Sequence, residues 1–303
     1  MIDVQGLSKR YGDLTAVDGV SFTVSPGRVT GFLGPNGAGK STTMRMIVGL
    51  DRPTSGSVLV NGREYRDSQA PLREVGALLE ARAVHTSRSA RNHLRVLAAT
   101  HGISRARVDE VLELVGLEGV AGKKAGAFSL GMGQRLGIAS ALLGDPAVLI
   151  LDEPINGLDP EGIRWVRELL RSLASQGRTV FVSSHLMSEM ALTADHVIVL
   201  GRGRVLADLP MEQLLSDAAR GVVEARTPAA SAFAVALRGR GAIVQESEPD
   251  LLEITGLTAA QIGEAAWEER IVLHGLAPQE TSLEEAFMEM TGASVDYRAG
   301  VPA

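Results

Sequence analysis

Eight residues near the N-terminus read Gly34-Pro35-Asn36-Gly37-Ala38-Gly39-Lys40-Ser41 and fit the pattern G-x-x-x-x-G-K-[ST]. An apolar run at 29–33 precedes them, and residues typical of a helix follow from 41 to 48. Glycines in such a turn let successive backbone N–H groups point inward as a cradle for phosphate oxygens. A glycine-rich turn without a ligand is the alternative interpretation, and the strand-before, helix-after context argues against it.

This loop predicts which residues bind ATP and its magnesium ion. Lys40 would place a positive charge on the β- and γ-phosphates, and the Ser41 hydroxyl would ligate Mg²⁺. The N-terminus of the following helix adds the positive end of its dipole. The nucleotide-binding residues expected from the loop are Gly34, Pro35, Asn36, Gly37, Ala38, Gly39, Lys40, Ser41 and Thr42.

A second motif lies at 147–154, where five apolar residues are followed by Asp152, Glu153 and Pro154. The run predicts a buried strand whose C-terminal end carries two carboxylates, and that end is where open parallel sheets bind ligands. Asp152 would hold Mg²⁺, and Glu153 would orient and deprotonate an attacking water. Alone, the pair is equally typical of a polar strand end. The phosphate loop upstream favours the catalytic interpretation.

The composition narrows the class of protein. The net charge is −6, and the 30 basic residues are scattered without a basic tail, which argues against nucleic acid as a partner. The chain has no cysteine, so disulfides and thiolate chemistry are excluded. No signal peptide is visible, and the longest apolar stretch, 136–151, is shorter than a membrane span and is broken by Asp145-Pro146. We therefore expect a soluble, cytoplasmic chain that reaches a membrane only through a partner.

Strand-like and helix-like segments alternate through the first two thirds of the chain. Strands are expected at 148–151 and 179–183, and a hairpin at 197–206 around Gly201 and Gly203. Helical periodicity covers 90–117, 130–143 and 161–175. This alternation predicts an α/β fold with a mainly parallel sheet.

The last third has a different pattern. Its expected elements are strand 222–226, helix 230–237, strands 242–246 and 251–255, helix 259–268 and strand 271–275. The order βαββαβ is that of small ferredoxin-like α+β folds. A last helix is expected from Ser282, with Glu285 at capping-box spacing. We expect a nucleotide-binding domain at 1–217 and an accessory domain at 218–303.

Four further features resemble one family of phosphate-loop proteins, the ABC ATPases. Residues 128–135, FSLGMGQR, look like the ABC signature, and residues 156–160, NGLDP, resemble the D-loop. His185 ends a strand as the switch histidine does, and Tyr11 stands where the family places an aromatic that stacks on adenine. Each is weak alone, but their order and spacing make the resemblance specific over about residues 1 to 215.

The resemblance implies a P-loop NTPase fold of the ABC type, with a helical subdomain. It also implies a head-to-tail homodimer that sandwiches two ATP molecules. Each ATP would lie between the loop of one subunit and Ser129 and Gly131 of the other. His185 would contact the γ-phosphate, and Asp159 would link the two sites.

Two departures from the usual family pattern stand out. Leu130 and Met132 replace the first signature glycine and the signature glutamine. Glu80 stands where a glutamine normally senses Mg²⁺, and it either binds the metal through oxygen or is simply a solvated side chain. Both departures, and the C-terminal segment 282–292, resemble bacterial drug- and peptide-resistance ATPases, such as the daunorubicin- and bacitracin-resistance types. That branch implies a separate ABC-2 type permease, export, and a location on the cytoplasmic face of the membrane.

Two other functions remain open from the residues alone. A non-transport ABC protein acting on ribosomes or DNA is the first, although such relatives usually have two ATPase domains or long coiled coils, which this chain lacks. The second makes residues 220–303 a ligand-sensing module. No polar or aromatic cluster there indicates a ligand, which favours a dimer-stabilising accessory domain.

Overall fold

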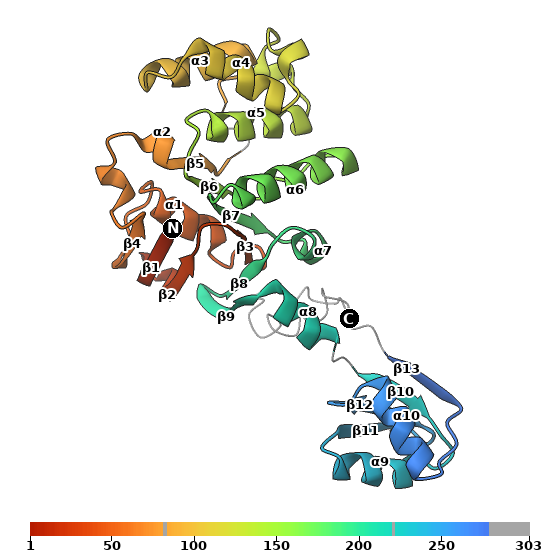
Figure 1. Cartoon of the computed structure of the whole chain (residues 1–303). Helices are drawn as coiled ribbons and strands as arrows, with labels where there is room; N and C mark the ends of the chain where they lie inside the picture. The colour runs from red at the N-terminus through yellow and green to blue at the C-terminus, as the bar shows by residue number, and fades with distance from the viewer. Residues whose placement is uncertain (81–83, 220–221, 279–303) are drawn as a thin grey trace, which may run out of the picture. The chain divides into compact units, whose positions relative to one another are not determined.

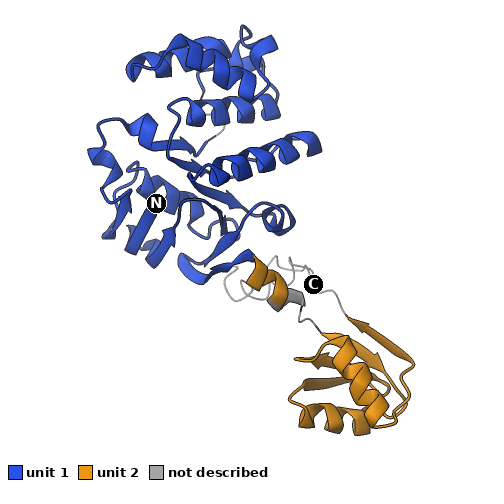
Figure 2. Cartoon of the chain, in the orientation of Figure 1, with its two compact units in different colours: residues 1–211, 291–303 blue, residues 212–290 orange. Residues whose placement is uncertain are grey.

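The computed structural model describes residues 1–80, 84–219 and 222–278. The chain divides into two compact units, residues 1–211 and a second unit that starts at residue 212 (Figure 2). The division falls at the start of helix α8 (Met211–Ala219), which also contains the expected boundary between residues 217 and 218.

The first unit is built on a six-stranded sheet with the order β5-β6-β7-β3-β8-β9 (Figure 1). Neighbouring strands are parallel except for the last, which pairs antiparallel with its neighbour as a hairpin. The expected mainly parallel sheet and the expected hairpin are therefore confirmed. The strands are β5 (Val75–Leu78), β6 (Val148–Leu151), β7 (Thr179–Ser184), β3 (Val29–Leu33), β8 (His196–Gly201) and β9 (Arg204–Pro210).

Helices and a second sheet cover both faces of this sheet. One face packs on α1 (Lys40–Ile47) and on an antiparallel sheet of order β2-β1-β4, which the sequence patterns did not predict as a separate layer. Phe22, Phe32 and Phe181 meet in the core between these layers, with ring centroids 5.0 to 5.7 Å apart. The elements of the small sheet are β1 (Ile2–Tyr11), β2 (Leu14–Val24) and β4 (Ser55–Val60).

The opposite face of the sheet packs on α6 (Pro160–Ser175) and α7 (Met187–Ala191). A Cβ at Gly31 in β3 would lie 2.6 Å from Met190 Sδ, so a larger residue there would force the Met190 side chain to shift. The six-stranded sheet is thus buried on both sides, which explains why β3, β6 and β8 are apolar almost throughout.

A helical segment follows β5 and forms the predicted helical subdomain (Figure 1). The continuous helical pattern expected at 90–117 is two helices, because Gly102 adopts a left-handed φ of 64° and Ser104 caps the second helix by accepting from the backbone of Arg107. The described helices of the segment are α3 (Ala90–Thr100), α4 (Arg105–Leu114) and α5 (Leu130–Leu142). Shorter helical turns in this segment are η2 (Glu118–Val120) and η3 (Ala125–Ala127), whereas η1 (Tyr65–Asp67) and α2 (Pro71–Glu74) precede β5.

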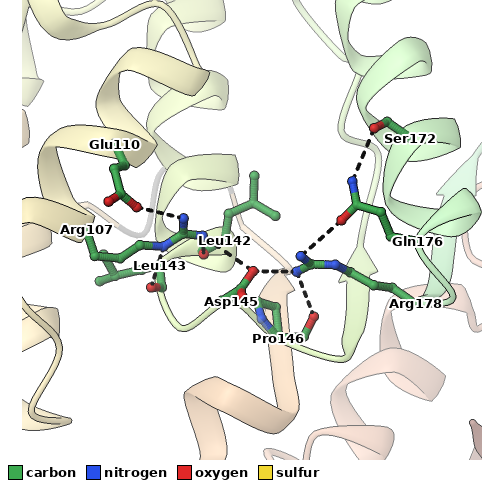
Figure 3. Close-up of polar contacts among 9 residues, drawn as sticks. All are labelled: Arg107, Glu110, Leu142, Leu143, Asp145, Pro146, Ser172, Gln176 and Arg178. Carbon is green, nitrogen blue, oxygen red and sulfur yellow. Dashed lines mark hydrogen bonds and ion pairs between the residues drawn. The ribbon is translucent and has the colours of Figure 1, made fainter.

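The end of α5 is tied to the sheet by Asp145 (Figure 3). Arg178, which precedes β7, places Nη1 2.7 Å from Asp145 Oδ1, and Arg107 of α4 places Nη2 3.6 Å from the same oxygen. The Arg107 guanidinium also donates to the carbonyls of Leu142 and Leu143, the last carbonyls of α5. One carboxylate therefore joins the helical segment to the amino ends of β6 and β7.

The second unit has the strand order β11-β12-β10-β13 with every pairing antiparallel. With one helix after β10 and one after β12, this is the expected βαββαβ topology. Phe233, Leu237 and Ile262 of the helices pack on the apolar side chains of β10 and β12. The elements are β10 (Val223–Arg226), α9 (Ala230–Gly239), β11 (Ile243–Glu248), β12 (Leu251–Thr255), α10 (Ala259–Glu268) and β13 (Gly275–Pro278).

The last strand of this unit was placed wrongly by the sequence pattern. The expected strand 271–275 is a loop except at Gly275, because Arg270 takes a φ of 56° and the Ile271 N–H donates to the carbonyl of Ala266. Ile271 and Leu273 pack on the core from this loop. Their spacing of two residues is the spacing expected of a strand, which is why the sequence pattern predicted one. The helix expected from Ser282 lies outside the described residues. No helix in the described part of the chain is long and apolar enough to cross a membrane.

Candidate functional site

The loop at 34–41 leaves the buried strand β3 and enters α1, as its spacing predicts. Gly37 and Gly39 take φ values of 82° and 103°, and a Cβ at Gly39 would lie 2.5 Å from the carbonyl of Ala16. Any larger residue at position 39 would therefore be both strained and obstructed. The loop lines a pocket of about 200 Å³ together with the two motif carboxylates. Its lining residues are Ala16, Asn36, Gly37, Ala38, Gly39, Lys40, Ser41, Thr42, Asp152 and Glu153.

Lys40 is the cation of this pocket, and its side chain is only about 7% exposed. Its Nζ donates to the carbonyl of Gly34 at 2.6 Å and to that of Pro35 at 3.2 Å. Burial lowers the pKa of Lys40, and the nearby charges of Glu153 and Asp152 oppose that shift. Two loop carbonyls thus hold a buried ammonium group where a phosphate oxygen could replace them as its partner.

The two carboxylates follow β6, and Ser183 of the neighbouring strand β7 organises them. The Ser183 hydroxyl donates to Asp152 Oδ1 and accepts from the backbone N–H of Glu153 at 2.9 Å. Glu153 has a left-handed φ of 49°, which is uncommon for a non-glycine residue. This turn sends its side chain toward Lys40, with Oε1 4.0 Å from Lys40 Nζ.

His185 joins the same group from the end of β7. Its Nδ1 lies 2.8 Å from Oε2 of Glu153. Glu153 therefore has Lys40 at one carboxylate oxygen and His185 at the other. A carboxylate held in this way, at the edge of a phosphate pocket, can accept a proton from a water that attacks a phosphoryl group.

The oxygen atoms that the pocket offers suit Mg²⁺, a metal that does not need all of its ligands from the protein. Asp152 and Ser41 line the same pocket and offer a carboxylate and a hydroxyl. Among the described residues, no group of three His, Asp or Glu side chains could hold a metal ion. Mg²⁺ commonly uses one or two protein oxygens and completes its shell with phosphate and water.

The predicted residues Tyr11 and Glu80 do not line this pocket. Tyr11 is 48% exposed at the end of β1, where its hydroxyl donates to Asp51 at 3.3 Å and Lys9 Nζ lies 4.9 Å from its ring centroid.

The Glu80 side chain is 71% exposed, 3.9 Å from Arg45, and lines a separate pocket beside Leu78 and His93. The structure thus leaves the Tyr11 ring accessible and places the Glu80 carboxylate beside Arg45.

Ser129, Gly131 and Asp159 do not line the pocket, and the segments that contain them pack on each other. Ser129 caps α5 by accepting from the backbone of Met132 at 3.2 Å, and Asp159 caps α6 by accepting from Gly162 at 2.9 Å. A Cβ at Gly131 would lie 3.3 Å from the carbonyl of Gly157. The beginnings of the two helices are therefore side by side in one chain.

Sequence reasoning missed two polar residues that hold the site together. Ser183 is fully buried at the end of an apolar strand. Gln134, within the signature segment, is about 2% exposed and donates through Nε2 to the carbonyl of Glu153 at 3.1 Å. For Ser183 the available signal was a polar side chain directly after the apolar run 180–182, because a buried polar group needs a hydrogen-bond partner. Gln134 lies between Gly133 and Arg135, and its sequence neighbours carry no such signal.

Comparison with known proteins agrees with this geometry. A family model described as ABC transporter matches residues 17–156, and one described as AAA domain, putative AbiEii toxin, matches 124–191. A domain of unknown function matches residues 221–284, within the second unit.

Solved structures with the same fold include an ATP-binding subunit of an ABC transporter, with a TM-score of 0.65, 29% identity and coverage of 72% of this chain and 92% of that chain. The dimeric cassette MJ0796 has a TM-score of 0.65 at 26% identity, over 70% of this chain and 99% of that chain.

Relatives extend the match along the sequence. The bacitracin transport ATP-binding protein BcrA of Bacillus licheniformis is 44% identical over 217 residues, 71% of each chain. The lantibiotic transport ATP-binding protein SrtF of Streptococcus pyogenes is 40% identical over 69% of this chain and 90% of its own. The uncharacterized ABC transporter ATP-binding protein YdbJ of Bacillus subtilis is 31% identical over 97% of this chain and 96% of its own. This chain belongs to the ATP-binding, ATP-hydrolysing subunits of ABC transporters.

Proposed function

We propose that this chain hydrolyses ATP to power the export of a peptide or drug-like molecule through a separate ABC-2 type permease. The observation that carries the ATPase part is the position of Glu153 between Lys40 and His185 at the phosphate pocket. The names of the bacitracin and lantibiotic relatives support the cargo class.

Each residue of the site has a step in this proposal. The backbone N–H groups of loop 34–41 and the start of α1 bind the phosphates, and Lys40 neutralises the β- and γ-phosphate charge. Glu153 accepts a proton as water attacks the γ-phosphorus, and His185 holds the Glu153 carboxylate in place. Mg²⁺, held by Ser41 and Asp152, would supply further neutralisation of the phosphate charge. ADP and inorganic phosphate are the products.

The second half of the site would come from a second copy of the chain. Ser129 and Gly131 begin α5, a 13-residue helix whose N-terminal N–H groups favour an anion. In a head-to-tail homodimer they would meet the γ-phosphate bound by the partner copy, with Asp159 beside them. Such a dimer would sit on the cytoplasmic face of the membrane, against the permease.

Capture of the partner tests this function. A tagged Glu153→Gln chain should bind ATP but turn over slowly, and should therefore trap the closed complex in detergent-solubilised cells with MgATP. Recovery of a polytopic membrane protein in stoichiometric amount is expected, with Glu168→Gln, an exposed glutamate of α6, as the matched control that hydrolyses normally. Recovery of ribosomal proteins or DNA-repair factors without a membrane protein would overturn the transport assignment.

A further inference from the structure

The backbone of Glu153 is held in an unfavourable conformation. Its φ of 49° lies in the left-handed region, which costs conformational free energy for a residue with a side chain. Such a conformation persists when surrounding contacts hold it. Since the same turn sets the direction of the Glu153 carboxylate, these contacts also aim the proposed base.

Three hydrogen bonds hold the Glu153 backbone. Its N–H donates to Ser183 Oγ at 2.9 Å, and its carbonyl accepts from the Asn156 N–H at 3.2 Å. The same carbonyl accepts from Gln134 Nε2 at 3.1 Å. Ser183 belongs to the adjacent strand and Asn156 to the same loop, so Gln134 is the contact that comes from the helical segment.

A second side chain of α5, Leu130, contacts the loop that follows Glu153. Leu130 precedes Gln134 by four residues, which places both side chains on one face of the helix. The Leu130 side chain occupies the space in which a Cβ at Gly157 would stand, and Gly157 has a φ of 76° that suits glycine. One face of α5 thus touches the segment from Glu153 to Gly157 at both of its ends.

The other end of α5 is also tied to β6. Arg107 donates to the last α5 carbonyls and lies beside Asp145, which Arg178 holds at the amino end of β6 and β7 (Figure 3). The helix is therefore attached at its C-terminal end by Asp145 and near its N-terminal end by Gln134. A rotation of α5 about the Asp145 end would move Gln134, and with it the Glu153 carbonyl.

From these contacts we infer that Gln134 is a positioning residue that couples the start of α5 to the Glu153 base. The inference rests on the proposed role of Glu153. Helix α5 begins with Ser129, which the proposed dimer presents to the partner's nucleotide. Gln134 therefore links the docking of a second copy at Ser129 with the alignment of the base in its own chain.

Substitution of the buried amide by an apolar side chain of similar length tests this role. Gln134→Met removes the donor, and we expect kcat to fall roughly 10- to 100-fold, the size of effect that a small misplacement of a catalytic group produces. KM for ATP should change less than about threefold, because the binding loop is untouched. Gln176→Met, at an exposed glutamine of the first unit that donates to Ser172, is the matched control and should keep wild-type turnover.

A double variant separates a positioning role from a merely structural one. If Gln134 acts through Glu153, Gln134→Met should cause no further loss of turnover in the Glu153→Gln background and should leave ATP-dependent trapping intact. Leu130→Ala should lower kcat in the same direction by a smaller factor and speed amide exchange at residues 153–158, whereas Leu114→Ala, an exposed leucine of α4, should do neither.

Two results would overturn the inference. The first is a normal kcat for Gln134→Met; the second is a loss of kcat that adds fully to that of Glu153→Gln. Absence of hydrolysis by the wild-type chain in complex with its permease would instead overturn the proposed ATPase role of the whole site.

Discussion

His185 Nδ1 and Glu153 Oε2 lie 2.8 Å apart, although 32 residues separate them in the chain. The contact exists because β6 and β7 are parallel neighbours, so the residues that follow the two strands leave the sheet at the same edge. The contact restricts the carboxylate that would act as base, and it gives His185 a role that does not require the nucleotide.

Replacement of His185 tests that role. His185→Ala should lower kcat for ATP hydrolysis by roughly 10- to 100-fold, because the Glu153 carboxylate loses one of its two fixed partners. ATP binding by the free chain should stay near wild type. His101→Ala, an exposed histidine after α3, is the control. A wild-type turnover rate for His185→Ala would contradict the assignment.

Lys40→Ala should weaken ATP binding. A charged hydrogen bond is worth roughly 1.5–3 kcal/mol, which corresponds to about a 10- to 150-fold rise in Kd. Titration with a fluorescent ATP analogue measures the change, with Lys123→Ala on the surface as the control. An unchanged Kd would refute the assignment of the phosphate loop.

Tyr11 can be tested by separating its ring from its hydroxyl. If the exposed ring stacks on adenine, Tyr11→Ala should cost about 1–3 kcal/mol of ATP binding, whereas Tyr11→Phe should cost little. Loss of affinity in both variants would instead point to the hydroxyl contact with Asp51. Equal affinity of both variants and wild type would remove Tyr11 from the site.

The Asp145 contacts predict an order of stabilities. Its side chain is about 62% exposed, so loss of charge in Asp145→Asn should lower the free energy of unfolding by less than about 1 kcal/mol. Asp145→Ala should cost about 1–2 kcal/mol more, since position 145 has a φ of 54° that asparagine tolerates better than alanine. Denaturant unfolding measures both, with Asp109→Asn, which removes an exposed pair with Arg91, for comparison. An alanine variant as stable as the asparagine variant would contradict the backbone argument.

Asp51 predicts a pH dependence. The hydrogen bond from Arg45 lowers the pKa of Asp51 below its ordinary value of 3.8, while burial opposes the shift. A lowered carboxyl pKa stabilises the fold above that ordinary value, and the stabilisation disappears as the pH falls through the lowered pKa. The stability difference between wild type and Asp51→Asn should therefore be largest near neutral pH and shrink below pH 3.8. A difference that stays constant down to acid pH would exclude this linkage.

Much of the site was predictable because its chemistry depends on short segments. Residues 34–41 and 147–153 carry their glycines, lysine and carboxylates at fixed spacings, and the local strand and helix patterns place them at the edge of a parallel sheet. Periodicity likewise predicted the βαββαβ order of the second unit. The wrong position of β13 shows the limit, because Ile271 and Leu273 have strand-like spacing but pack from a loop.

The amino-acid sequence by itself determined the family, the phosphate loop and the identity of the two carboxylates, since these follow from residue types at short range. Only the tertiary structure decided that His185 and Lys40 hold Glu153 from either side, that Glu80 pairs with Arg45, and that Gln134 supports the Glu153 backbone. These contacts join residues from different strands and helices. The distances between these residues depend on how the layers pack, and local sequence patterns do not determine that packing.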